Sequence, residues 1–252
     1  MDSGKAVFCS LYLNSEEVIF MRRVCILLLC VCLFVMPVSA QAAPNTKYVA
    51  LTFDDGPSGK YTRRLLEGLW ERDAHATFFL CGYRMDQYPD LVLQILEEGH
   101  EIGCHGATHT SMVNMSRREI CAEIVSMQEK LPEDCTTRFF RPPGGFVTEG
   151  VQQVAQARQQ AIISWSVDPK DWAVKDAAAV ERMVLKNVRD GDIILLHDMT
   201  DSSVRAALNI VDALERQGYE FVTVSDLAKK RDTRILPGKI YTSFPPKEEA
   251  VK

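Results

Sequence analysis

The strongest constraint on the fold is a regular alternation of strand-like and helix-like segments along most of the chain. The expected strands are short apolar stretches at residues 48–52, 76–80, 101–103, 138–140, 161–167, 192–196 and 220–224. Stretches with helical spacing of apolar residues separate them, at residues 61–72, 91–98, 116–131, 149–159, 177–188 and 204–217. Such alternation builds βαβ units and a parallel sheet. We therefore expect an α/β fold, a distorted or incomplete (β/α) barrel with about seven parallel strands.

Two details support this interpretation. Ser116 precedes the apolar spacing of its helix and Glu119 follows three residues later, which is the pattern of a capping box. No G-x-G-x-x-G sequence follows any expected strand, which argues against a dinucleotide-binding fold.

The chain divides into three parts by composition. Residues 1–42 are a leader, residues 43–231 form a single α/β domain without an internal break, and residues 232–252 are a polar C-terminal tail. The tail contains Pro237, Pro245 and Pro246 and ends in a charged stretch. We expect it to have little structure.

The leader has the pattern of a secretory signal. Arg22 and Arg23 precede twelve consecutive apolar residues, Val24 to Val35, and the small residues Ser39 and Ala40 follow. Cleavage after residue 40 or 42 would release an extracytoplasmic protein. The alternative is an uncleaved membrane anchor, although twelve residues fall short of the roughly 20 that cross a bilayer as a helix.

The first twenty residues fit a signal poorly, because Glu16 and Glu17 stand where basic residues are expected. We predict that translation starts at Met21.

Charge and cysteine content narrow the function classes. The formal net charge is −5, so no basic surface indicates a nucleic-acid partner. Four of the eight cysteines lie in the leader, and an exported chain can pair the remaining four. The expected disulfides are Cys81–Cys104 and Cys121–Cys135, and the alternative is four buried free thiols. We expect a monomer.

Polar residues that could take part in catalysis or metal binding follow one expected strand after another. In parallel α/β folds the loops after the strands meet at one end of the sheet and carry the active site. These residues are Asp54, Asp55, His105, His109, Arg141, Asp168, Asp171, His197 and Asp198, together with the Pro-Pro-Gly-Gly stretch at residues 142–145. Two histidines and a carboxylate are a common ligand set for a divalent metal, zinc above all. An H-x-x-x-H pair alone is weak evidence, but the Asp54-Asp55 pair on a separate loop strengthens it.

The motifs resemble those of the polysaccharide deacetylases, the family-four carbohydrate esterases that include the nodulation-type chitooligosaccharide deacetylases. Five stretches carry the resemblance in the family's order, at residues 52–56 (TFDDG), 105–109 (HGATH), 141–145 (RPPGG), 168–172 (DPKDW) and 195–197 (LLH). The similarity extends from about residue 47 to residue 227. It implies a distorted (β/α) barrel, and makes residues 43–231 a deacetylase catalytic domain.

The resemblance also implies a role for individual residues. Asp54 is similar to the general base, and His197 to the general acid. Arg141 is similar to the arginine that positions the base and keeps it ionised, and Asp171 to the partner of the acid. The implied metal ligands are Asp55, His105 and His109, and the implied substrate contacts are Trp172, Leu195 and Gly144. The metal is expected to be Zn²⁺, with Co²⁺, Mn²⁺ or Ni²⁺ as alternatives.

Two positions depart from the family's pattern. The family usually has Ser or Thr where this chain has Gly106, so the loop that carries the histidines lacks a hydroxyl that could fix it. The family usually has an aromatic residue where this chain has Gly144, which removes a side chain that would contact a sugar. The second departure affects the choice of substrate rather than the reaction.

The expected activity is therefore metal-dependent hydrolysis of N-acetyl groups on amino sugars of a polysaccharide or oligosaccharide. Peptidoglycan is favoured, because a catalytic domain with a bacterial-looking leader would meet the cell wall, and chitooligosaccharides come next. Removal of O-acetyl groups and a non-catalytic carbohydrate-binding protein are the alternatives. A two-carboxylate glycosidase would not need the histidine pair. A zinc protease would require a glutamate at Gly106.

Overall fold

A single sheet of parallel strands organises the part of the chain that the structure describes. This computed structural model describes residues 46–133 and 135–247. The strands are β1 (Lys47–Asp54), β2 (Ala76–Leu80), β3 (Glu101–Cys104), β4 (Phe139–Phe140), β5 (Ala161–Ile163), β6 (Ile193–His197), β7 (Tyr219–Phe221) and β8 (Ile240–Tyr241). Their order is β6-β1-β2-β3-β4-β5-β8, and β7 pairs with the first residues of β1. Seven of these strands are the predicted ones, and their parallel pairing confirms the α/β class.

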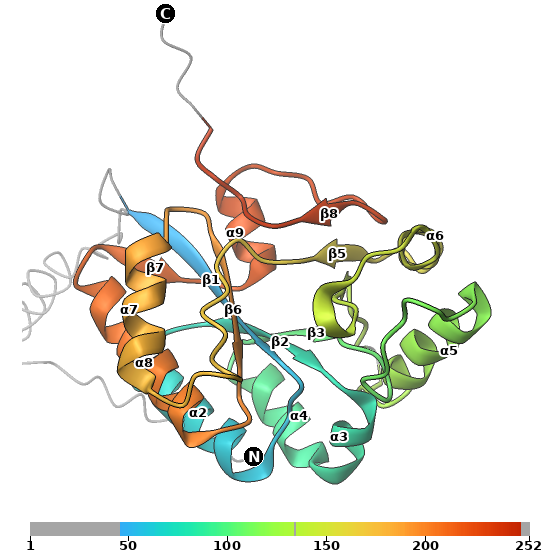
Figure 1. Ribbon diagram of the computed structural model, residues 1–252, viewed down its shortest axis with the longest axis horizontal. Coiled ribbons are helices and arrows are strands. Elements are labelled where there is room, and N and C mark those ends of the chain that lie inside the picture. Colours follow the sequence, from blue (N-terminus) through green and yellow to red (C-terminus); the bar gives the residue numbers. More distant parts are fainter. Residues whose placement is uncertain (1–45, 134, 248–252) are drawn as a thin grey trace, which may run out of the picture. The chain divides into compact units, whose positions relative to one another are not determined.

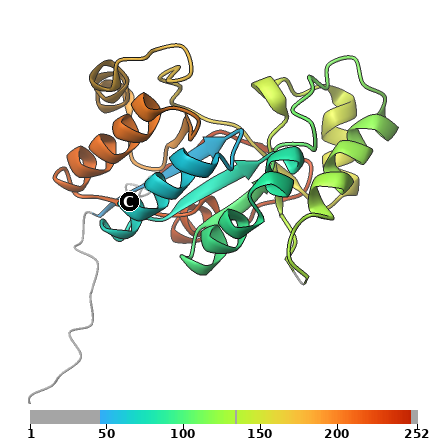
Figure 2. The ribbon, with the colours of Figure 1, turned by 90° about the horizontal axis from the view of Figure 1, so that it is seen from below.

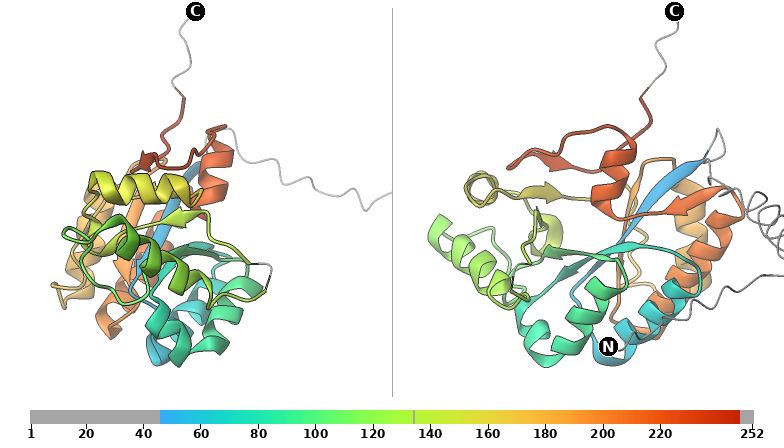
Figure 3. Two further views of the ribbon diagram at one scale, coloured as in Figure 1. Left: turned by 90° about the vertical axis from the view of Figure 1, so that its right-hand side faces the viewer. Right: turned by 180° about the vertical axis from the view of Figure 1, so that it is seen from behind.

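The sheet curls but does not close into a regular barrel. After β5 the chain crosses to β6, where Val167 forms an isolated parallel bridge with Ile194. This crossing explains why the strand predicted at residues 161–167 ends at Ile163. The result is the distorted (β/α) barrel expected from the sequence (Figures 1 and 3).

Helices connect the strands and, apart from the last of them, cover the outer face of the sheet (Figure 2). They are α2 (Gly59–Trp70), α3 (Gly82–Gln87), α4 (Pro89–Glu97), α5 (Arg117–Gln128), α6 (Glu149–Ala157), α7 (Ala177–Asn187), α8 (Asp201–Glu215) and α9 (Val224–Lys230). The exception is α9, whose buried residues Val224, Leu227 and Ala228 pack with Ala50 and Phe79. The predicted capping box is present at α5, where Ser116 and Glu119 each accept a backbone hydrogen bond from the other. No helix among the described residues is long and apolar enough to cross a membrane.

Alternation along β1 separates two apolar clusters. Val49, Leu51 and Phe53 belong to the large cluster between the sheet and the helices. Ala50 belongs to a second cluster, with Phe79, Ile163 and Ile193 among its members, on the inner side of the curled sheet. Because successive side chains of a strand point to opposite faces, Thr52 and Asp54 also face this inner side.

Residues 232–247 are not the structureless tail that the composition predicted. β8 pairs in parallel with β5 (Figure 1), and Phe244 is buried in the inner cluster. The Phe244 backbone N–H donates to the Gly191 carbonyl at 2.7 Å, which joins this segment to the loop before β6. A strand of two residues, too short to stand out in the sequence, therefore completes the edge of the sheet.

The predicted disulfides are absent. Cys81, Cys104, Cys121 and Cys135 are all free thiols. The register places Leu80, not Cys81, opposite Cys104, so the two cysteines are not cross-strand partners. The structure therefore has the alternative, free thiols, although only Cys81 and Cys104 are buried and Cys121 and Cys135 are half-buried. The secretory signal and the start at Met21 lie outside the described residues.

Candidate active site

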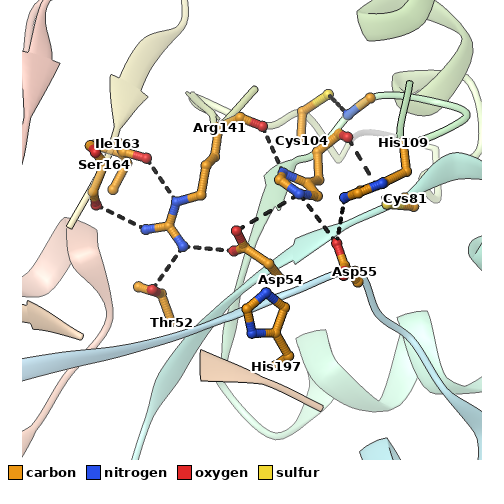
Figure 4. Close-up of polar contacts among 12 residues, drawn as sticks. Thr52, Asp54, Asp55, Cys81, Cys104, His109, Arg141, Ile163, Ser164 and His197 are labelled. Atoms are coloured by element: carbon orange, nitrogen blue, oxygen red, sulfur yellow. Dashed lines mark hydrogen bonds and ion pairs between the residues drawn. The ribbon is translucent and has the colours of Figure 1, made fainter. Parts of the chain in front are cut away.

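The candidate site begins at the C-terminal end of β1, in the centre of the sheet. Asp54 lies in register with Phe79 on one neighbouring strand and with His197 on the other. Asp55 is the first residue beyond the strand and has a φ of +73°, a conformation that non-glycine residues rarely adopt. Asp54 faces Arg141 and Asp55 faces His109, as Figure 4 shows. His105 Nε2 lies near both carboxylates, 3.8 Å from Asp54 Oδ2 and 3.3 Å from Asp55 Oδ1.

Asp54 is paired with Arg141, which follows β4. Arg141 Nη1 lies 2.6 Å from Asp54 Oδ1 and also donates to the Thr52 hydroxyl at 2.9 Å. The other guanidinium nitrogens donate to the carbonyls of Ile163 and Ser164. The guanidinium is fully buried and these contacts fix its position, so it in turn fixes the orientation of the Asp54 carboxylate.

Asp55 gathers the two histidines of the loop after β3. Its Oδ1 lies 3.3 Å from His105 Nε2 and 2.9 Å from His109 Nε2. The nearby ligand atoms of the three residues all lie within 4.8 Å of one another. Burial opposes ionisation of Asp55, but His105 and His109 outweigh it and lower the pKa of the carboxylate below its ordinary value.

This cluster fits a divalent metal. Asp55 Oδ1 is buried and accepts no well-oriented hydrogen bond from the described residues. His105 Nδ1 lies 2.7 Å from the Arg141 carbonyl oxygen. In the tautomer in which Nδ1 donates to this oxygen, Nε2 keeps a lone pair that can bind a metal. One carboxylate and two imidazoles are a ligand set typical of zinc sites that keep a position open.

His197 lies on the other side of Asp54, at the end of β6. Its Nδ1 contacts Asp171 Oδ1 at 2.8 Å, and its backbone N–H donates to Asp171 Oδ2 at 2.9 Å. Burial disfavours the imidazolium, but the hydrogen bond and charge of Asp171, with smaller contributions from Asp54 and Asp55, raise the pKa of His197 to about 9. The ring is therefore protonated at neutral pH.

One cavity of about 400 Å³ brings the predicted site residues together. Eight of the ten line it, namely Asp54, Asp55, His105, His109, Gly144, Trp172, Leu195 and His197. Arg141 and Asp171 are buried and do not line the cavity, but each contacts a residue that does, Asp54 and His197 respectively. A larger hollow of about 600 Å³ beside α9 contains none of the ten.

Two further residues were not predicted, Trp165 and Glu123, and a third, Asp198, was expected at this end of the sheet but was given no role. Trp165 lines the cavity and lies against Gly145, where an added Cβ would come within 2.4 Å of its ring. Glu123 accepts hydrogen bonds from the histidine loop. Asp198 is fully buried under Gly56, and burial raises its pKa to about 7, although the Thr62 hydroxyl opposes the shift. The sequence offers no local signal for the first two, because their contacts span 15 residues or more.

Comparison with known proteins identifies the family. A model described as polysaccharide deacetylase matches residues 41–162. A peptidoglycan-N-acetylglucosamine deacetylase of Bacillus cereus is 40% identical over 193 residues, which cover 73% of this chain and 90% of that protein. The chain belongs to the polysaccharide deacetylase family.

Solved structures of polysaccharide deacetylases and related esterases share the fold. The peptidoglycan deacetylase PdaC from Bacillus subtilis has a TM-score of 0.72 at 33% identity, over 75% of this chain and 94% of that one. A family 4 acetyl xylan esterase from Clostridium thermocellum, in complex with a cobalt ion, has a TM-score of 0.74 at 32% identity, over 79% and 100% of the two chains. Other relatives are longer, and this chain spans 40–42% of their length. The predictions of the family, the barrel fold and a hydrolase of acetyl groups are confirmed.

Proposed function

We propose that this polysaccharide deacetylase removes N-acetyl groups from amino sugars of peptidoglycan outside the cytoplasm. The observation that carries the proposal is the placement of Asp54, the metal-ligand cluster and His197 around one cavity. The substrate class rests on the relatives, which are named as deacetylases of peptidoglycan N-acetylglucosamine and N-acetylmuramic acid. The location rests on the leader pattern of the sequence.

Asp55, His105 and His109 would hold the metal, which we propose to be Zn²⁺. Such an ion lowers the pKa of water in its open position and polarises a carbonyl oxygen. The cobalt ion in a solved relative agrees with a site that accepts transition metals.

The two flanking groups divide the proton transfers of amide hydrolysis. Asp54 accepts a proton from the water that attacks the acetyl carbonyl, and Arg141 keeps the carboxylate aimed at it. His197, protonated through Asp171, donates its Nε2 proton to the departing amine. The carbon–nitrogen bond breaks, and acetate and the free amino sugar are released.

The cavity walls orient the acetyl group. Leu195 is buried and Trp172 is 63% exposed, so together they offer an apolar surface to the acetyl methyl. A backbone N–H at Gly144 would support the developing oxyanion. Although Gly144 lacks the family's aromatic side chain, the ring of Phe146 lies against it and is 61% exposed, so an aromatic surface is still present here.

The pH dependence tests the assignment of the acid. His197 must be protonated, so kcat/KM falls as the pH rises through its pKa. Asp171→Asn removes the charge that raises this pKa, and the alkaline limb should move to lower pH by about one unit or more. Measuring pH–rate profiles and the titration of the ring by NMR would check this. An unchanged alkaline limb in the variant would contradict the role of Asp171.

Acetate release tests the function itself. We expect the metal-loaded protein to release acetate from N-acetylated peptidoglycan faster than from chitin oligomers or acetylated xylan. A chelator should abolish the release and Zn²⁺ should restore it. Preference for acetylated xylan would indicate an esterase. Binding of peptidoglycan without acetate release on any substrate would indicate a non-catalytic protein.

A further inference from the structure

We propose that Glu123, a residue of α5, is the positioning residue of the loop that carries both histidine ligands, so that metal affinity depends on it. The inference rests on the proposed metal site and extends it to a residue that does not touch the ion. Its basis is a set of hydrogen bonds from the loop to this single carboxylate.

The histidine loop donates three hydrogen bonds to Glu123. The backbone N–H groups of Ala107 and Thr108 donate to Oε2 at 2.8 and 2.9 Å, and the Thr108 hydroxyl donates to Oε1 at 2.9 Å. These donors lie between His105 and His109 in the sequence. Hydrogen bonds to a charged acceptor are roughly twice as strong as neutral ones, so the carboxylate is a strong anchor.

A second set of bonds holds the opposite side of the same loop segment. The carbonyls of Gly106 and Ala107 accept from the backbone N–H groups of Gly82 and Tyr83 at 3.0 and 2.9 Å. The loop is thus attached to the start of α3 through its carbonyls and to α5 through its N–H groups. Removing Glu123 leaves the carbonyl bonds to the start of α3 but takes the acceptor from the Ala107 and Thr108 N–H groups.

The loop needs this support, because its backbone is strained at the ligand. His109 has a φ of +61° directly after Thr108. Non-glycine residues rarely adopt such a conformation, and it persists only where the surroundings fix it. The His109 side chain is 42% exposed to solvent, so packing in the core contributes little to its position.

Glu123 also accounts for the missing hydroxyl at position 106. Gly106 has a φ of +83°, and an added Cβ would lie 3.2 Å from Glu123 Oε2. The carboxylate therefore occupies the space next to Gly106 and takes over the anchoring expected from a Ser or Thr. The helix that carries Glu123 is anchored to the core, because Ile120 and Ile124 are fully buried.

The test is the affinity of the metal-depleted protein for Zn²⁺, measured by competition with a chromophoric chelator. Glu123→Ala should weaken binding by about 10–100-fold, the range for outer partners of metal ligands. Glu123→Gln keeps the length and an accepting oxygen but loses the charge, so its affinity should lie between those of the wild type and Glu123→Ala. Glu123→Asp keeps the charge but cannot reach both N–H groups, so it should lose affinity as the alanine variant does. At saturating Zn²⁺, kcat of the variants should return close to that of the wild type.

Two controls separate this inference from the proposed function. Glu129→Ala removes an exposed carboxylate from the end of the same helix and should leave Zn²⁺ affinity unchanged. His105→Ala should abolish high-affinity binding. If His105→Ala loses Zn²⁺ and Glu123→Ala does not, the inference about Glu123 is wrong and the metal site stands. If His105→Ala binds as the wild type does, the metal assignment fails and the inference falls with it. A Glu123→Gln variant as weak as Glu123→Ala, with both folded by circular dichroism, would also overturn it.

Discussion

Asp54→Asn should lower kcat by about 10²-fold or more and leave Zn²⁺ affinity close to that of the wild type. The amide cannot take a proton from water, which removes general base catalysis. Its oxygen can still accept the hydrogen bond that Arg141 Nη1 gives to Asp54 Oδ1 at 2.6 Å, so the side chain should keep its orientation. Single-turnover acetate release and chelator competition on the same preparation would measure the two effects.

Asp168→Asn is the matched control for this substitution. Asp168 lines the same cavity, but its Oδ1 accepts a hydrogen bond from the backbone N–H of Lys170 and does not contact Arg141. Its amide variant should stay within a few fold of wild-type turnover. An Asp54→Asn variant that turns over at the wild-type rate would rule out Asp54 as the base.

The main features of the fold follow from local patterns in the sequence. The apolar spacing of Leu65, Leu66 and Leu69 predicts the buried face of α2, and all three are fully buried. The parallel arrangement then follows from the alternation of strands and helices, and brings the loops after five strands to one place. The candidate site could be assembled from the sequence for this reason, since its residues lie at the C-terminal ends of strands or in the loops that follow them.

The features that were missed depend on contacts between distant segments. β8 has two residues, and its pairing with β5 links positions about 78 residues apart, so no local pattern marks it. The cysteine pairing depends on a register in which Leu80, not Cys81, faces Cys104. Glu123 has the sequence neighbourhood of an ordinary exposed helix residue. Only the tertiary structure shows that the histidine loop donates to it.

Arg141→Met should destabilise the metal-free protein by about 3–5 kcal/mol, the usual cost of removing one partner of a buried ion pair. The guanidinium is fully buried and lies 4.0 Å from the Phe79 ring centre, so methionine fits the apolar surroundings but leaves the Asp54 carboxylate unpaired. Urea denaturation would measure the loss. Arg158→Met, which removes an exposed guanidinium that contacts Gln128, should change the free energy of unfolding by about 0.5 kcal/mol or less.

The double variant Asp54→Asn/Arg141→Met identifies the origin of this loss. Neutralising Asp54 removes the unpaired buried charge, so the double variant should be more stable than Arg141→Met alone. Recovery should be incomplete, because the carbonyls of Ile163 and Ser164 still lack their donors, at about 1–3 kcal/mol for each unsatisfied group. A double variant no more stable than the single one would mean that the two carbonyls, rather than Asp54, make Arg141 indispensable. The arginine would then stabilise the crossing from β5 to β6 first and position the base only as a consequence.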